Sequence, residues 1–318
     1  MRTRQLGNTD LHLTTVGFGA WAIGGGDWAY GWGPQDDAES VRAIHRALDL
    51  GVNWIDTAAV YGLGHSEEVV ARALADRRGK VIVATKCGLR WRGPKMIYGR
   101  LTAASIREEA EASLRRLRLE AIDLYQIHWP NPDNEIEEGW RAMADLVREG
   151  KVRWAGVSNF SVGQLERARQ IHAVASLQPP YSMLRRDVEA ELLGYCAARQ
   201  MGVVVYSPML AGLLTGGFVS RERLEKLAPG DWRRNDRFFR EPAFSRAQVL
   251  VERLRPIADR EGRTLAQLAV AWTLRRPEVT AAIVGARCAA QIEETAASGD
   301  WEIGKELEEE IEGVIGEG

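Results

Sequence analysis

Residues Val81 to Gly88 read Val-Ile-Val-Ala-Thr-Lys-Cys-Gly, an apolar β-branched run that ends in a charged residue and a glycine. The run is too short for a helix, and β-branched side chains favour an extended backbone. Two further segments have the same character, "IDLYQI" from Ile122 and "GVVVY" from Gly202. We predict that all three are buried strands.

Short apolar runs of this kind alternate along the chain with longer segments of helical period. The predicted strands begin near Val16, Val52, Val81, Ile122, Val152, Ala175, Val203 and Thr280. Between the first two runs, Val41, Ile44 and Leu48 share one helical face, and Gly51 follows as a C-terminal cap. Strands that alternate with helices are joined by crossovers, so we expect a parallel sheet.

The spacing of these units bears on the domain organisation. No Pro- or Ser-rich linker divides the 318 residues, so we predict one α/β domain over residues 1–318 that closes into a (β/α)8 TIM barrel rather than an open sheet. A long loop, roughly Met209 to Phe244, and two helices precede the last strand. We also predict a short hairpin over residues 4–14 and an amphipathic C-terminal outer helix whose glutamates face solvent.

Composition narrows the possible partners. The net charge is −2 with no large block of one sign, which gives no electrostatic case for nucleic acid or an anionic membrane. Three widely spaced cysteines are expected to be reduced thiols. Without a signal peptide or a run of about 18 apolar residues, the protein is expected to be cytoplasmic. The expected partner is a small molecule, and the oligomeric state stays open.

Polar side chains stand where neighbouring predicted strands end. Asp56 ends the second strand, Tyr61 lies in the loop that follows, Lys86 ends the third strand, and His128 ends the fourth. Active sites of such barrels lie at the C-terminal ends of the strands. Each residue alone has an ordinary structural explanation as a cap, a packing aromatic, a solvated lysine or a loop histidine. Their convergence on neighbouring strand ends favours a site.

This set of groups suits the reduction of a carbonyl. Hydride transfer to the carbonyl carbon leaves an alkoxide that needs a proton, and a free phenol with a pKa near 10 is a weak acid. An ammonium within about 4–6 Å lowers that pKa. We therefore interpret Tyr61 as the general acid, Lys86 as the group that lowers its pKa, and Asp56 as the partner that holds Lys86. His128 would donate a hydrogen bond to the substrate oxygen, and no metal is expected.

Seven segments, in order along the chain, resemble the aldo-keto reductase family. They are GVNWIDTAAVYGLGHSEEVV, VIVATKCG, LYQIHWP, GVSNFS, LQPPYSMLRR, GVVVYSPMLAGLLTG and AAIVGARCAAQIEE. The match runs from about Gly17 to Glu294. It implies a (β/α)8 barrel, a nicotinamide cofactor and a catalytic tetrad that falls on Asp56, Tyr61, Lys86 and His128.

The resemblance also implies a cofactor site on the same rim. Ser158, Asn159 and Gln178 are expected to hold the carboxamide, while Tyr206 stacks on the nicotinamide ring. The expected cofactor contacts are Gly19, Ala20, Trp21, Asp56, Ser158, Asn159, Gln178, Tyr206, Ser207, Pro208, Leu210, Gly212, Arg237, Gly285, Arg287, Gln291 and Glu294.

The segment after the last strand bears on which cofactor is used. Gly285 and Arg287 open a helix, and helix N-termini attract phosphate. Arg287 can pair with a ribose 2′-phosphate, while Gln291 and Glu294 face the adenosine, so we expect NADP(H) rather than NADH. An unpaired surface arginine is the alternative. Arg237 is expected to reach the cofactor as the long loop closes.

Tryptophans are predicted to surround the substrate mouth, namely Trp21, Trp28, Trp91 and Trp129. The expected substrate contacts are Trp21, Tyr61, His128 and Trp129, although several tryptophans could simply pack. Gly17 to Ala22 also satisfies the Gly-x-Gly-x-x-Gly/Ala string of a dinucleotide-binding turn. That motif requires a helix directly afterwards, and Ile23 to Asp27 is instead a glycine-rich loop, so we set it aside.

Two other functions fit the same residues. One is a cofactor-binding regulatory subunit of low turnover that resembles potassium-channel β subunits, which the sequence does not exclude. The other makes Lys86 a Schiff-base nucleophile of an aldolase-like barrel. Asp56 disfavours the second, because a neighbouring carboxylate keeps the amine protonated.

Overall fold

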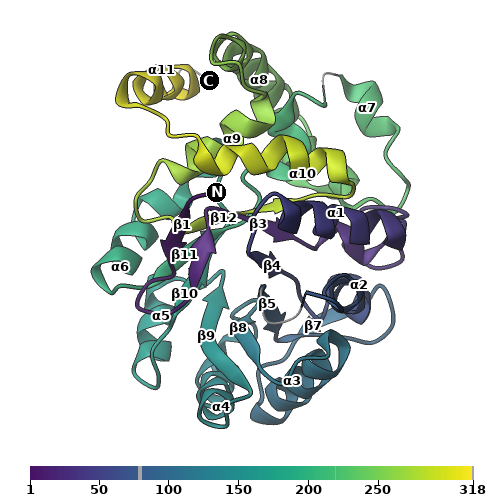
Figure 1. The fold of residues 1–318 in the computed structure, drawn as a ribbon, viewed down its shortest axis with the longest axis vertical. Coiled ribbons are helices and arrows are strands. Elements are labelled where there is room, and N and C mark those ends of the chain that lie inside the picture. Colours follow the sequence, from purple (N-terminus) through teal and green to yellow (C-terminus); the bar gives the residue numbers. More distant parts are fainter. Residues whose placement is uncertain (78–80, 219, 317–318) are drawn as a thin grey trace.

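A closed barrel of parallel strands forms the centre of the computed structural model, which describes residues 1–77, 81–218 and 220–316 (Figure 1). Its strands are β3 (Val16–Gly19), β4 (Trp54–Asp56), β5 (Ile82–Cys87), β8 (Ile122–Ile127), β9 (Val152–Ser158), β10 (Ser176–Gln178), β11 (Gly202–Val205) and β12 (Ala281–Gly285). The barrel closes where β12 pairs in parallel with β3, with Ala282 opposite Val16. The predicted (β/α)8 fold and its eight strands are confirmed.

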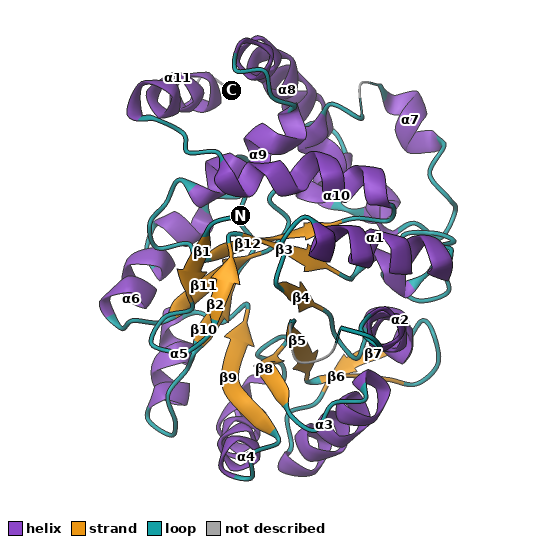
Figure 2. Ribbon diagram, in the orientation of Figure 1, coloured by secondary structure: helices purple, strands orange, loops and turns teal. Residues whose placement is uncertain are grey.

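Helices surround the strands (Figure 2). They are α1 (Asp37–Asp49), α2 (His65–Ala73), α3 (Ala103–Leu117), α4 (Ile136–Arg148), α5 (Val162–Arg169), α6 (Leu192–Ala198), α7 (Arg221–Glu225), α8 (Ala243–Arg260), α9 (Leu265–Leu274), α10 (Ala289–Ala296) and α11 (Lys305–Gly316). Helix α4 buries Ile136, Trp140 and Met143 because these residues recur every three or four positions and so share one face. Among the described residues, no helix is both long and apolar enough to cross a membrane.

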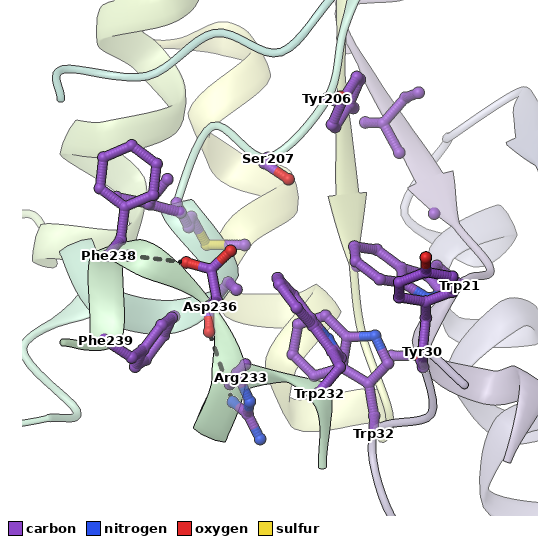
Figure 3. Close-up of a pocket in the computed structure, with 18 of the residues that line it drawn as sticks. Trp21, Tyr30, Trp32, Tyr206, Ser207, Trp232, Arg233, Asp236, Phe238 and Phe239 are labelled. Carbon is purple, nitrogen blue, oxygen red and sulfur yellow. Dashed lines mark hydrogen bonds between the residues drawn. The ribbon is translucent and has the colours of Figure 1, made fainter. Parts of the chain in front are cut away.

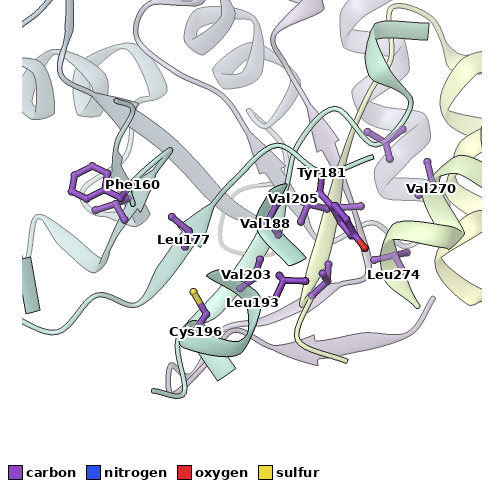
Figure 4. Close-up of a cluster of buried hydrophobic side chains, with 14 of the residues drawn as sticks. Phe160, Leu177, Tyr181, Val188, Leu193, Cys196, Val203, Val205, Val270 and Leu274 are labelled. Carbon is purple, nitrogen blue, oxygen red and sulfur yellow. The ribbon is translucent and has the colours of Figure 1, made fainter. Parts of the chain in front are cut away.

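The layer between strands and helices is apolar and tightly filled. Figure 4 shows part of it, a buried cluster that includes Leu177 of β10, Val203 of β11, and Leu193 and Cys196 of α6. Full burial of one such aliphatic side chain contributes about 1.5–3 kcal/mol. This layer holds the strands in register, so the residues at the strand ends stand on a rigid frame.

The predicted N-terminal hairpin is present as β1 (Thr3–Gln5) and β2 (His12–Thr14), which pair in antiparallel fashion. Asn53, just before β4, accepts the backbone N–H of Thr14 at 2.8 Å. The hairpin therefore lies at the end of the barrel where the strands begin. Its buried Leu6, Leu11 and Leu13 pack against side chains of the barrel strands, which closes that end and leaves the opposite rim for a site.

Two segments between the barrel strands differ from the sequence-based expectation. A second hairpin, β6 (Leu89–Trp91) and β7 (Ile97–Gly99), follows β5 and was not predicted. The long loop from Met209 to Phe244, of which Val219 lies outside the described residues, contains α7 and three short 3-10 helices. These are Leu210–Thr215, Trp232–Asn235 and Arg237–Phe239.

The C-terminal helix packs on the outside of the barrel as predicted, with Ile311 fully buried. Its glutamates were expected to face solvent, and two of them do so only in part. Glu308 and Glu312 each accept a hydrogen bond from Arg275 at 2.9 Å, and the Arg275 side chain is only 3% exposed. A buried guanidinium needs counter-charges, so the carboxylates of these two glutamates contact Arg275 while part of each side chain stays exposed.

Candidate active site

The four predicted catalytic residues come to one rim of the barrel. Asp56 is the last residue of β4, Lys86 lies near the end of β5, and His128 directly follows β8. Tyr61 begins a short 3-10 turn after β4, and its position depends on Gly62. A methyl group on Gly62 would lie 2.0 Å from the carbonyl oxygen of Gly24. The two backbones therefore touch directly, which fixes the turn that carries Tyr61.

Lys86 connects the carboxylate and the phenol. Its Nζ donates to Asp56 Oδ2 at 2.5 Å, to the carbonyl oxygen of Thr57 at 2.9 Å and to the Tyr61 hydroxyl at 3.3 Å. These three acceptors match the three protons of an ammonium group. The Lys86 side chain is fully buried, so it acts on the cavity only through Tyr61 and Asp56.

His128 completes the group on the other side of Tyr61. The two ring centroids lie 5.6 Å apart, and the ring planes are nearly perpendicular at 79°. The backbone of His128 is held at both ends, because its N–H donates to Cys87 and its carbonyl accepts from Asn159 Nδ2 at 3.0 Å. Both rings line the same cavity. A single small polar group can therefore meet both the phenol and the imidazole.

Burial controls the protonation of these groups. It raises the pKa of Tyr61 well above its usual value near 10, and the negative charge of Asp56 acts in the same direction. Burial lowers the pKa of Lys86, although Asp56 opposes that shift. Burial and the charge of Lys86 hold the pKa of His128 well below its usual range, so the imidazole is neutral at pH 7.

The net shift of the Tyr61 pKa is therefore upward, opposite to the lowered pKa that was expected from the neighbouring Lys86. Asp56 and Lys86 form an ion pair with little net charge, so the loss of hydration has the larger effect. The consequence suits an acid, because the phenol keeps its proton at neutral pH.

An elongated cavity of about 1450 Å³ runs from these residues across the rim. Of the predicted cofactor contacts, all except Ala20 line it: Gly19, Trp21, Asp56, Ser158, Asn159, Gln178, Tyr206, Ser207, Pro208, Leu210, Gly212, Arg237, Gly285, Arg287, Gln291 and Glu294. Ala20 is instead buried, and its N–H donates to the carbonyl oxygen of Asp56 at 2.8 Å while its carbonyl accepts from Ser66. It therefore fixes the position of Asp56 rather than facing the cavity.

The residues predicted to hold a carboxamide form one hydrogen-bonded group. Gln178 Nε2 donates to Asp56 Oδ1 at 2.8 Å, which leaves Asp56 bound by both Lys86 and Gln178. Ser158 Oγ donates to the carbonyl of Gln178, and the Tyr206 hydroxyl donates to Asn159 Oδ1 at 2.9 Å. The side chains at the ends of β9, β10 and β11 are thus held in fixed orientations along one wall.

The backbone after β11 has an unusual conformation in the cavity wall. Ser207, Leu210, Ala211 and Gly212 have φ angles of 57°, 48°, 54° and 93°. A left-handed conformation costs a non-glycine residue about 1–2 kcal/mol, and such strain is typical of ligand sites. The polar wall, this turn and an arginine at the far end suit a dinucleotide that has a carboxamide at one end and phosphates beyond it.

Many cavity residues were not predicted, and they include a group of aromatic side chains from several loops (Figure 3). Trp232 stacks on Trp21 with ring centroids 4.8 Å apart, and Trp32 packs edge-on against both. Arg185 and Arg233 also line the cavity. Loop residues that meet from distant parts of the chain share no local pattern, so the high tryptophan content was the only available signal.

Three of the four tryptophans predicted to surround the substrate mouth line the cavity, and one does not. Trp21, Trp28 and Trp129 line the cavity, as expected for the mouth. Trp91 does not, because it belongs to β6 and lines a small separate hollow next to Arg90 and Glu108. That prediction was wrong because no pattern in the sequence indicates the second hairpin.

A buried carboxyl behind the site makes stability depend on pH. Glu109 Oε2 accepts the N–H of Gly88, two residues after Lys86, at 3.0 Å, and Ser105 donates to Oε1. Burial raises the pKa of Glu109 from 4.5 to about 7. As the pH rises from 4.5 to 7, the unfolded chain releases this proton while the folded protein keeps it. The free energy of unfolding therefore falls across this window.

We expect Glu109→Gln to remove this pH dependence. The amide can accept from Gly88 and donate to Ser105, but it does not titrate. Relative to the wild type, the variant should gain about 2–3 kcal/mol in free energy of unfolding between pH 5 and pH 8. Urea denaturation at both pH values measures this gain. Glu108→Gln, at an exposed neighbour, is the control, and an unchanged difference between pH 5 and pH 8 would contradict the prediction.

Known proteins are similar to this chain over nearly its whole length. A model of the Aldo/keto reductase family matches residues 15–315. The protein is similar to Aldo-keto reductase YhdN of Bacillus subtilis (strain 168), with 36% identity over 318 residues that cover 99% of this chain and 94% of the relative. It is also similar to the NADH-specific methylglyoxal reductase of Escherichia coli (strain K12), with 35% identity over 94% of this chain and 93% of the relative.

A solved structure shows the same similarity in three dimensions. The glycerol dehydrogenase AKR11B4 from Gluconobacter oxydans superimposes with a TM-score of 0.89 at 38% identity, covering 99% of this chain and 95% of that chain. The resemblance therefore extends over the barrel and the loops that carry the site.

Proposed function

This chain belongs to the aldo-keto reductase family of oxidoreductases, and we propose that it reversibly reduces an aldehyde or ketone to an alcohol, with NADPH as the cofactor and Tyr61 as the general acid. The observation that carries the proposal is the contact of Lys86 Nζ with both Asp56 Oδ2 and the Tyr61 hydroxyl, beside His128 in the cavity wall.

The chain's own residues supply the proton and hold the substrate oxygen. The bound nicotinamide supplies the hydride. Tyr61 transfers its hydroxyl proton to the substrate oxygen, which becomes the alcohol. The ammonium of Lys86, 3.3 Å from that hydroxyl, stabilises the phenolate left behind, and Asp56 keeps the ammonium in place. Neutral His128 donates its remaining N–H to the same oxygen and so orients the carbonyl.

Residues along the whole cavity would hold the cofactor. Ser158, Asn159 and Gln178 would hold the carboxamide, and Tyr206 would stack on the ring. Arg287 would bind a ribose 2′-phosphate, which is the reason for preferring NADPH. The relative from Escherichia coli is named as NADH-specific, so this preference is a prediction about Arg287 and the residues around it.

A screen of carbonyl compounds tests the proposal. Loss of NADPH absorbance is followed with a panel of aldehydes and ketones that includes methylglyoxal, and the reverse reaction is followed with glycerol, because two similar proteins are named for these compounds. We expect carbonyl-dependent oxidation of NADPH. Tight cofactor binding with negligible turnover on the whole panel would instead support a regulatory subunit of low turnover and would defeat the proposal.

The Schiff-base alternative is disfavoured by the environment of Lys86. All three protons of the ammonium have acceptors, and the side chain has no exposed surface. A Schiff base requires a neutral amine that meets a carbonyl carbon. Borohydride treatment in the presence of a carbonyl substrate should therefore trap no adduct, which mass spectrometry of the intact protein can check.

A further inference from the structure

Arg287 is held at the far end of the cavity by neutral acceptors. Its Nε donates to Gln35 Oε1 at 2.6 Å, and its terminal nitrogens donate to the carbonyl oxygens of Trp32, at 3.4 Å, and Pro34. Its backbone N–H donates to Gln291 at 2.7 Å. The guanidinium is therefore fixed in position while its charge is not cancelled by these contacts.

Gln35 contacts this arginine through both the oxygen and the nitrogen of its side-chain amide. While Oε1 accepts from the guanidinium, Nε2 donates to the backbone carbonyl of Arg287 at 2.9 Å and to Ser40 Oγ at 3.0 Å. The two donor contacts fix which way the amide faces. The amide oxygen consequently points at Arg287, so Gln35 holds the arginine in place without carrying a charge.

The charge of Arg287 has no counter-ion in the part of the chain that the structure describes. A second cavity arginine, Arg233, differs in this respect, because Asp231 pairs with it at 2.6 Å and is almost fully buried. Partial burial and the like charge of Arg233 lower the pKa of Arg287, and the charge of Asp231, which forms no ion pair with Arg287, opposes that shift only in part. A partly buried guanidinium that has no ion-pair partner favours the binding of an anion.

We propose that Gln35 is a positioning residue that sets the preference of this cavity for a phosphorylated ribose. By holding Arg287 with an amide rather than a carboxylate, it keeps the full positive charge in the cavity for the 2′-phosphate of NADPH. The inference rests on the proposed function, since it requires that the cavity binds a nicotinamide dinucleotide. A glutamate at residue 35 would form an ion pair with Arg287 and cancel that charge.

The substitution Gln35→Glu tests the inference with almost no change in shape. Binding of NADPH and of NADH is measured separately by quenching of tryptophan fluorescence, without turnover. We expect the Kd for NADPH to rise by about 10- to 100-fold, equivalent to about 1.4–2.8 kcal/mol, and the Kd for NADH to change little. Gln35→Ala, which removes the same donors without adding charge, should weaken NADPH binding less. Gln170→Glu adds the same charge at an exposed residue outside the cavity and should change neither Kd.

A double variant identifies the route of the effect. If Gln35 acts through Arg287, then Gln35→Glu should lose its selective effect on NADPH in an Arg287→Ala background. Equal weakening of both cofactors by Gln35→Glu, or a selective effect that persists without Arg287, would overturn the inference while leaving the proposed function intact. A wild-type protein that binds neither cofactor would overturn the proposed function itself.

Discussion

Tyr61→Phe is expected to lower the rate of carbonyl reduction by about 10²- to 10⁴-fold, the range for loss of a positioned general acid. The substitution removes only the hydroxyl. The ring should keep its contacts with Trp21 and Trp28, whose centroids lie 6.2 Å away, and Lys86 keeps its other two acceptors. Cofactor affinity should therefore stay nearly unchanged.

Single-turnover measurements at saturating cofactor separate the chemical step from binding. The matched control is Tyr98→Phe, because Tyr98 also lines the cavity but has no contact with Lys86. Its rate should stay close to that of the wild type. If Tyr61→Phe retained full activity, another group would have to supply the proton, and the assignment of Tyr61 as the acid would be wrong.

Lys86→Met is expected to reduce both turnover and stability. The side chain of Asp56 is 4% exposed, and removal of its partner leaves a buried carboxylate without a counter-charge. Loss of one member of a buried ion pair costs about 3–5 kcal/mol. Turnover should fall because the phenolate of Tyr61 loses the ammonium that stabilises it.

The double variant Asp56→Asn/Lys86→Met distinguishes these two effects. It removes the unpaired charge, and the asparagine oxygen can still accept from Gln178, so most of the free energy of unfolding should return. Turnover should not return, because the ammonium is still missing. Urea denaturation and single-turnover rates are measured for the two single variants and the double variant. A Lys86→Met protein as stable as the wild type would contradict the prediction, because it would show that leaving Asp56 without its counter-charge does not lower the free energy of unfolding.

The strands and the catalytic rim could be predicted because their signals are local. A buried parallel strand is a short, mainly apolar run, and a polar or charged residue stands at or near its end. Asp56 ends its strand, Lys86 lies one residue before the end of its strand and His128 directly follows its strand, so finding the strand also located the side chain. The resemblance to a family then extended the prediction to the cofactor wall, where the structure brings Ser158 and Gln178 together.

The loops could not be predicted in the same way. The second hairpin that carries Trp91 has no long apolar pattern, and the stacking of Trp21 on Trp232 joins segments from opposite parts of the chain. The hydrogen bond from Arg287 to Gln35 joins two residues that are 252 positions apart in the sequence. Such contacts depend on how loops meet after the barrel has closed, and periodicity in the sequence carries no information about that.

By itself, the sequence determined the eight-stranded barrel and the residues that gather on its rim, because hydrophobic period and strand ends are properties of neighbouring residues. Only the tertiary structure decided the protonation of the site and the state of its charges. Burial, which raises the pKa of Tyr61 despite the nearby Lys86, and the neutral surroundings of Arg287 both arise from water excluded by the whole fold. The physical reason is that desolvation is set by everything packed around a group, whatever its distance along the chain.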